Sequence, residues 1–560
     1  MRQSELIRAA YEGKNTLVIK NANVVNVFTD EIVRADVAVY EDVIIGVGSY
    51  SGENEIDAGG AYLAPGFIDA HVHIESSMVI PSSFMKVIMP HGTTTVIADP
   101  HEIANVAGAA GIRAMYKLTD ELPLRVLFML PSCVPATPFE HSGAKLVAED
   151  MEQFMHKSRI LGLGEVMDAN SVINCSQEML DKLRLFDKRP IDGHAPMLEG
   201  MGLNAYRVAG AFSDHECSTY EEVKQKLATG MNILLRIGSA ANNMDDVLRR
   251  IAKEKLPTRN MMFCTDDKHP NDLLEKGHID YIVRRAIKSG VDPIIAVKCA
   301  SHHAARYFLL NNRGAIAPGF LADFVVIDNF DDFNILEVYK KGKLMFDGKT
   351  VTPFEAPEID PHLIKRSHET FHVAHLEATD FIESRPRAVL GMVPGEIVTT
   401  DAGYAEKISV EDDILKIAVI ERHKNTHHIG IGYIKGYGLK SGAVATSISH
   451  DSHNIIVVGA NEEDMAAAVN RVVELGGGIV VLDHGKVLGE VRLQIAGIMS
   501  EEPLVDVNRE LENAKEKAFA LGVSRGVDPF MTLSFMALPV IPTLRLTTRG
   551  VFDTVTQKYV

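Results

Sequence analysis

Short apolar runs that alternate with helix-like stretches dominate the chain between residues 63 and 264. Strands that alternate with helices favour a parallel sheet, because parallel neighbours need long crossover connections. Eight strands over roughly 240 residues predict a (β/α)8 barrel. The eight candidate strands are 63–70, 92–98, 124–130, 160–166, 190–193, 209–212, 231–237 and 260–264.

Two further segments, residues 16–48 and 314–348, are rich in Val and Ile and alternate apolar with polar positions. This period of two is typical of antiparallel strands with one buried face. We expect the two segments to pair into one small β-sandwich domain that flanks the barrel and is built from both sides of it.

Beyond residue 352 the pattern changes again. Pro353, Pro357 and Pro361 stand among many charges without a clean period, which predicts a linker. The remainder mixes strands with helices; one helix is predicted to begin after Asn461 and to end at Gly476.

The predicted fold class is therefore α/β, with a C-terminal α+β domain. The expected bounds are 1–62 and 308–352 for the β-sandwich domain, 63–307 for the barrel, 353–375 for the linker and 376–560 for the C-terminal domain.

Composition narrows the class of protein. The chain has 560 residues, a formal charge of −18 and 46% hydrophobic residues. A negative charge opposes non-specific binding to nucleic acid or to an anionic membrane. The five scattered cysteines and an N-terminus without an apolar core favour a cytoplasmic protein. We expect a small-molecule substrate, no nucleic-acid or membrane partner, and a homo-oligomer, since barrels with extra domains often associate.

Polar residues that can bind metals follow the predicted strands directly. His71 and His73 follow the first, and alternate residues of an extended strand face the same way. Barrel strands bring their C-terminal ends together, so residues after different strands are expected to meet. The other candidates, which follow strands four, five, six and eight, are Glu165, His194, His215 and Asp266.

Four imidazoles and two carboxylates can hold two divalent ions. We expect Glu165 to bridge the ions, and a water shared between them to lose a proton near neutral pH. Asp266 can bind one ion, accept that proton and pass it to a leaving group. Any one of these residues alone would more often be a hydrogen-bonded core residue. Six of them in the phase of a barrel favour a metal-dependent hydrolase.

Two signatures support this interpretation. Residues 64–73 (APGFIDAHVH) resemble the opening signature of the amidohydrolase superfamily, and residues 314–327 resemble its closing one. The resemblance covers residues 16–350 and implies a metal-dependent hydrolase. Many members use a carboxylated lysine as the bridge. Glu165 stands at that position here, which argues against cyclic-imide hydrolases such as the dihydroorotases.

Longer motifs are similar to those of the bacterial adenine deaminase family. They are residues 71–77 (HVHIESS), residues 91–106 and residues 449–454 (SHDSHN), the last within the C-terminal extension. The resemblance implies hydrolysis of adenine to hypoxanthine and ammonia, in purine salvage, at a binuclear manganese or iron(II) centre. The alternatives are an amidohydrolase acting on another aminopurine or a cyclic amide, and a non-catalytic barrel scaffold.

Deamination also needs a group that protonates N1 of the purine. Asp99, His101 and Glu102 follow the second strand and are the candidates, with Glu102 as the proton donor if burial raises its pKa. Glu75 and Ser76 are candidates for contact with the purine. The C-terminal histidines, such as His450 and His453, favour a cap over the barrel mouth or an oligomer interface rather than a second metal site.

Overall fold

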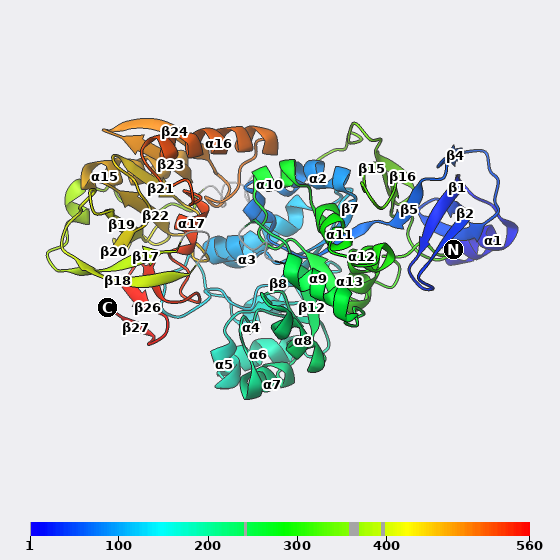
Figure 1. Cartoon of the computed structure of the whole chain (residues 1–560), viewed down its shortest axis with the longest axis horizontal. Coiled ribbons are helices and arrows are strands. Elements are labelled where there is room, and N and C mark those ends of the chain that lie inside the picture. The colour runs from blue at the N-terminus through cyan, green and yellow to red at the C-terminus, as the bar shows by residue number, and fades with distance from the viewer. Residues whose placement is uncertain (1, 240–243, 358–368, 394–397) are drawn as a thin grey trace.

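The computed structural model describes residues 2–239, 244–357, 369–393 and 398–560. Figure 1 shows three parts in a row: an N-terminal β-rich part, a central part of mixed helices and strands, and a C-terminal part that contacts the centre from the opposite side. Within the described residues, no helix is long and apolar enough to cross a membrane.

Eight strands lie in the described residues of the central part. Parallel pairing joins the first five into one sheet, in the order β10-β9-β8-β7-β6, and the last three into another, in the order β11-β12-β13. The strands are β6 (Phe67–Val72), β7 (Thr93–Ala98), β8 (Arg125–Leu130), β9 (Ile160–Val166), β10 (Ile191–Gly193), β11 (Ser213–Asp214), β12 (Asn232–Arg236) and β13 (Met261–Cys264).

Backbone contacts connect the two sheets at both edges. The amide of Phe212 donates to the carbonyl of Ile191 at 3.1 Å, and the amide of Asp266 donates to the carbonyl of His71 at 2.9 Å. Val72 and Asp266 also form an isolated parallel bridge. The arrangement is of the TIM-barrel type, and it brings the ends of β6 and β13 together.

Two predicted strands need correction. The first predicted strand, 63–70, spans two structural strands, because β5 (Tyr62–Pro65) pairs with the flanking sheet and β6 begins at Phe67. The sixth, predicted at 209–212, lies instead at Ser213–Asp214. This strand is only two residues long and polar, so it has no apolar run of its own.

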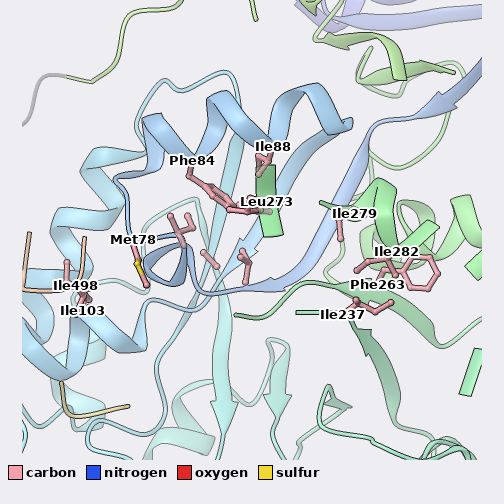
Figure 2. Close-up of a cluster of buried hydrophobic side chains, with 14 of the residues drawn as sticks. Met78, Phe84, Ile88, Ile103, Ile237, Phe263, Leu273, Ile279, Ile282 and Ile498 are labelled. Carbon is pink, nitrogen blue, oxygen red and sulfur yellow. The ribbon is translucent and has the colours of Figure 1, made fainter. Parts of the chain in front are cut away.

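Helices cover the central strands in the expected alternation. Figure 2 shows part of the buried cluster between them, in which Phe84 and Leu273 lie in one group and Ile282 lies in another with Phe263 and Ile237. The helices are α2 (Pro81–Ile88), α3 (His101–Leu118), α4 (Ala148–Glu152), α5 (Ala169–Ile173), α6 (Gln177–Leu185), α7 (Gly200–Val208), α8 (Tyr220–Ala228), α9 (Asp245–Glu254), α10 (Pro270–Glu275), α11 (Ile279–Lys288), α12 (Pro293–Cys299) and α13 (His302–Tyr307).

The two flanking segments pair with each other, as expected, in one hydrogen-bonded sheet. Its order is β16-β15-β14-β5-β1-β2-β3, with β4 beside β1. The sheet is continuous because β1 pairs with β2 on one side and with β4 and β5 on the other. Its elements are α1 (Arg2–Glu12), β1 (Leu17–Asn26), β2 (Glu31–Tyr40), β3 (Val43–Gly48), β4 (Glu55–Asp57), β5, β14 (Phe324–Ile327), β15 (Ile335–Lys340) and β16 (Lys343–Phe346).

The C-terminal part combines an eight-stranded sheet with two long helices. Asn461 caps α15 by accepting from the amide of Asp464, and Gly476 ends the helix in the left-handed region, as predicted. The elements are β17 (Arg387–Met392), β18 (Thr399–Ala405), β19 (Ile414–Ile420), β20 (Ile429–Lys435), β21 (Ala443–Thr446), β22 (Ile455–Gly459), α15 (Glu462–Leu475), β23 (Gly478–Asp483), β24 (Lys486–Arg492), α16 (Leu504–Ala520), α17 (Met531–Phe535), β25 (Leu544–Thr547), β26 (Gly550–Asp553) and β27 (Lys558–Tyr559), with short 3-10 turns at Ile74–Ser77, Met89–His91 and Ala378–Phe381.

The C-terminal part docks on the loop that follows β6. The amide of Ser500 donates to the carbonyl of Met78 at 2.8 Å, and the amide of Ile80 donates to the carbonyl of Ser500 at 3.0 Å. Ile498 is buried next to Ile103 and near Met78 in Figure 2. Of the predicted linker, residues 358–368 lie outside the described residues.

Candidate active site

The six predicted metal ligands lie in one cluster at the C-terminal ends of the central strands, in which all are buried except the partly exposed His194. The Nε2 atoms of His71 and His73 are 3.1 Å apart. The Oδ1 atom of Asp266 lies 3.0 Å from Nε2 of His73 and 3.4 Å from Nε2 of His71. The strands therefore place these three side chains around one point, as the sequence predicts.

Glu165 lies between two groups of histidines. Its Oε1 atom is 3.2 Å from Nε2 of His73, whereas its Oε2 atom is 2.7 Å from Nδ1 of His194 and 3.2 Å from Nε2 of His215. Each carboxylate oxygen thus faces a different set of imidazole nitrogens. This is the arrangement that a bridging carboxylate requires.

The donor set fits divalent ions. Imidazole nitrogens and carboxylate oxygens are their usual ligands. Nδ1 of His73 donates to the backbone carbonyl of Asp99 at 2.8 Å, which leaves the lone pair of Nε2 directed at the cluster. Two sets of potential ligand atoms overlap here, one formed by His71, His73 and Glu165 and the other by Glu165, His194 and His215.

The charges of the cluster favour ionised carboxylates. Burial alone would raise the pKa of Glu165, but hydrogen bonds from His101, His194, His215 and His73 hold it well below its usual value. Burial would likewise raise the pKa of Asp266, and the guanidinium of Arg236 overcomes this effect. Burial lowers the pKa of His71 to about 4, which keeps this imidazole neutral and able to bind a cation.

A buried aspartate fixes the strand that carries the first two histidines. Oδ1 of Asp69 accepts the amides of His71 at 3.2 Å and of Thr265 at 3.1 Å. Its Oδ2 lies 3.1 Å from Nε2 of His278. Asp69 therefore ties the end of β6 to the loop that carries Asp266.

A cavity of about 440 Å³ opens beside the cluster. Its lining comes from two distant parts of the chain, so the C-terminal part forms one wall. The central part contributes, among others, His73, His101, Glu102, Glu165, His194, His215, Glu216, Arg236, Asp266 and Asp267; the C-terminal part contributes Val398, His450, Asp451, Phe535, Leu538, Val540, Ile541 and Pro542. Its position as a wall agrees with the predicted cap over the barrel mouth.

The structure separates the candidates that follow β7. His101 and Glu102 line the cavity, and Nδ1 of His101 is 3.1 Å from Oε1 of Glu165. Asp99 lies behind the cluster instead, where its Oδ2 accepts the amide of Glu165 at 3.0 Å. Asp99 is fully buried and is not among the lining residues that the structure describes, because its side chain points toward the strand of Glu165.

Glu75 and Ser76 are also placed differently from the expectation of substrate contact. Oε1 of Glu75 accepts the amide of Ile103 at 3.4 Å, and Oγ of Ser76 donates to Asp267 at 2.5 Å and lies 3.4 Å from Glu102. Both are buried, and neither belongs to the described lining. The short 3-10 turn after His73 directs them behind Glu102 and Asp267.

Sequence reasoning missed Glu216 and Arg236. Nη2 of Arg236 donates to Oε2 of Glu216 at 2.9 Å, and its Nη1 pairs with Asp266. Oε1 of Glu216 lies 3.6 Å from Nδ1 of His194 and 3.5 Å from Nε2 of His215. The signal was present, because Arg236 ends the seventh strand and Glu216 directly follows His215.

A buried ion pair supports the second group of histidines. Nζ of Lys226 lies 2.8 Å from Oδ2 of Asp214 and 2.7 Å from Oε1 of Glu222, and its side chain is fully buried. Oδ1 of Asp214 accepts the amide of Ala195 at 2.8 Å, which joins the loop after β10 to the end of β11.

Lys226→Met is expected to lower the free energy of unfolding by about 3–5 kcal/mol, because it leaves the Asp214 carboxylate buried without its cation. Urea-induced unfolding of both proteins measures the difference. Lys224→Met, an exposed change on the same helix, is the control and is expected to shift stability by no more than about 0.5 kcal/mol. Equal stability of the Lys226 variant and the wild type would contradict this account.

A TIM-type core with four imidazoles and two carboxylates at its strand ends is the arrangement of a metal-dependent hydrolase. Residues 62–345 match the model of the amidohydrolase family, and residues 396–558 match that of the adenine deaminase C-terminal domain.

Full-length relatives match as well. Adenine deaminase 2 of Carboxydothermus hydrogenoformans is 44% identical over 96% of this chain and 95% of its own. The adenine deaminase of Kosmotoga olearia is 45% identical over 97% and 96%. A crystal structure of an adenine deaminase covers 60% of this chain and 100% of its own, at 17% identity and a TM-score of 0.46. The chain belongs to the adenine deaminase family, within the amidohydrolases.

Proposed function

We propose that this protein hydrolyses adenine to hypoxanthine and ammonia, in purine salvage. The observation that carries the proposal is the match of both the central and the C-terminal parts to relatives called adenine deaminase, at 44% and 45% identity over nearly the whole chain. The cavity beside the cluster of six candidate ligands is the proposed binding site for the substrate.

The cluster is proposed to hold two divalent ions, manganese or iron(II). His71, His73 and Asp266 would hold one and His194 and His215 the other, with Glu165 between them. The distances of each Glu165 oxygen to a different histidine set support this division. Such ions, when bound, supply Lewis acidity and lower the pKa of bound water toward neutrality.

The chain's own side chains are proposed to move the protons. Asp266 accepts a proton from the water that attacks C6, and passes it to the amino group that leaves as ammonia. Arg236 keeps Asp266 ionised until then, as their ion pair supports. Glu102 gives a proton to N1 while the C6–O bond forms, which makes C6 electrophilic. As the C6–N bond to the leaving ammonia breaks, the remaining proton of the C6 hydroxyl returns to Glu102, so both side chains end in their starting states. His101 faces the same cavity and keeps Glu165 in place.

Three of the residues first considered for catalysis or substrate contact are proposed to act indirectly. Asp99 holds the backbone of Glu165, Glu75 holds the start of α3, and Ser76 contacts Asp267 and Glu102. Each side chain is buried behind a residue that lines the cavity, which supports a positioning role.

The larger organisation is proposed to follow the sequence analysis. The contacts at both edges of the central sheets support a closed (β/α)8 barrel over residues 63–307. The flanking β domain would comprise 1–62 and 308–352, and the linker and the C-terminal α+β domain 353–375 and 376–560. We propose a cytoplasmic homo-oligomer that acts on a small molecule, without a nucleic-acid or membrane partner.

Release of ammonia from a panel of purines tests the proposed function. Protein reconstituted with manganese or iron(II) is expected to turn over adenine, and the metal-free form is expected to be inactive. Turnover of another aminopurine or a cyclic amide in place of adenine would favour the related amidohydrolase. Inactivity of the reconstituted enzyme toward the whole panel would favour a non-catalytic scaffold. Either result would contradict the proposal.

A further inference from the structure

The carboxyl group of Glu102 is contacted by a loop of the C-terminal domain. Nδ1 of His450 lies 3.3 Å from Oε1 of Glu102, and Nε2 of His453 lies 3.9 Å from Oε2. Glu102 and His453 are almost completely buried. Each oxygen of the carboxyl group therefore faces its own imidazole, and the two histidines come from a chain segment about 350 residues away from Glu102 in sequence.

The spacing of these three side chains would also suit a metal ion, but the tautomer of His453 argues against one. The amide of Ser449 donates to Nδ1 of His453 at 3.4 Å, so Nδ1 carries the lone pair and Nε2 carries the proton. A protonated Nε2 cannot bind a cation. It faces a carboxyl oxygen of Glu102 at 3.9 Å, to which it can donate after a small shift, and it has no hydrogen-bond partner among the described residues.

His450 is held in place by packing. Its ring stacks on that of Phe535, with the centroids 4.7 Å apart and an angle of 16° between the planes. Both rings line the cavity. The stacking on Phe535 restrains the ring of His450 in its present orientation. In this orientation Nδ1 faces Oε1 of Glu102.

The loop that carries both histidines is itself tied to the rest of the protein. The fully buried Arg422 donates from Nε to the carbonyl of His453 and from Nη2 to that of Ala496, the latter at 2.8 Å. Nδ2 of Asn454 donates to the carbonyl of His141 in the central domain at 2.7 Å. These hydrogen bonds fix the position of the loop relative to the barrel.

We propose that His450 and His453 are positioning residues that hold the carboxyl group of Glu102 in the orientation for proton transfer to the purine. The C-terminal domain is then part of the catalytic machinery. Without it, the carboxyl group of Glu102 would lose the two imidazoles that orient it. This inference rests on the proposed role of Glu102.

Several charged or titratable groups surround Glu102, and together they set its titration. Burial and the nearby carboxylates raise its pKa well above the usual value, while the imidazoles oppose this effect. An N–H that donates to the carboxylate stabilises the ionised form and lowers the pKa. The surrounding groups are Glu75, Asp267, His73, His101, His450, Asp451 and His453.

The test compares His453→Met with His453→Gln in the full-length, metal-loaded enzyme. Methionine removes the N–H, whereas the amide of glutamine can present an N–H at the same position. For His453→Met, kcat is expected to fall about 10- to 100-fold with little change in KM, since misplacing a reacting group carries a cost of that order. The loss of activity at high pH is expected to shift upward, because Glu102 stays protonated longer. His453→Gln is expected to regain most of the activity and the wild-type pH profile.

His423→Gln is the matched control, because Nε2 of His423 donates to the carbonyl of Ser452 in the same loop at 2.8 Å without contacting Glu102. It is expected to leave the high-pH limb unchanged. An equal shift in this control, or a wild-type kcat and pH profile for His453→Met, would overturn the inference. So would a third metal ion that is present in the wild type and lost in His453→Met. If Glu102→Gln is also fully active, the proposed function of Glu102 fails as well, which distinguishes the two failures.

Discussion

Glu102→Gln is expected to lower kcat by about 10²- to 10⁴-fold, the contribution that proton transfer by a positioned side chain makes to catalysis. The amide keeps the size of the side chain but cannot give up a proton to N1. Glu102 lines the cavity and does not contact the six candidate metal ligands in the structure, so the metal content is expected to stay at the wild-type level. Steady-state kinetics with adenine and elemental analysis measure the two quantities.

The sign of the pH dependence follows from the raised pKa of Glu102. The protonated carboxyl is the active form, so its contribution is present at low pH and is lost as the pH rises through the raised pKa. The wild type should therefore lose activity on the alkaline side through this group, and the Gln variant should lack that limb. Normal turnover by Glu102→Gln would remove Glu102 from the mechanism.

Glu165→Ala is expected to lose at least one metal ion per chain. The substitution removes the carboxylate whose two oxygens face different histidine sets. The loss of several kcal/mol of transition-state stabilisation from an ion corresponds to a decrease in kcat of about 10³-fold or more. Elemental analysis of the purified variant measures the metal, and ammonia release measures the rate.

Glu178→Ala is a suitable control for this experiment. Glu178 is a partly exposed carboxylate of the same domain that pairs with Lys145 at 2.6 Å and with Lys182 at 3.5 Å, and it contacts none of the six candidate ligands. The control should keep both ions and the wild-type rate. Two retained ions in Glu165→Ala would contradict the bridging role, whatever the rate.

The convergence of the six candidate ligands could be predicted because residues that directly follow different barrel strands meet at the same end of the barrel. Each of them follows a short strand, so the position of the strand determines the direction of the side chain. Arg236 and Glu216 also stand at strand ends, so their positions near the cluster were predictable in the same way. Their pairing with each other and with Asp266 was not, because it depends on which side chains meet above the strands.

Other features were hidden for different physical reasons. An alternating pattern shows that one face of a strand is buried, but it does not show which strands lie beside it. The pairing of β1 with β2 on one side and with β4 and β5 on the other could therefore not be predicted. The strand Ser213–Asp214 is polar and short. It is a strand because it pairs with β12, and its composition alone does not predict one. The contact of His450 and His453 with Glu102 depends on how two domains dock, for which the sequence carries no periodic signal.

The division of the cavity between two distant chain segments has a consequence for biosynthesis. All six candidate ligands lie before residue 267, whereas the wall formed by His450, Asp451 and Phe535 comes much later in the chain. At a synthesis rate of about 5–20 residues per second, the nascent barrel waits roughly 10–40 s for His450 to be made. During that interval the ligand cluster is uncovered on one side, so cations can reach it from the surrounding solution before the closing wall has been translated.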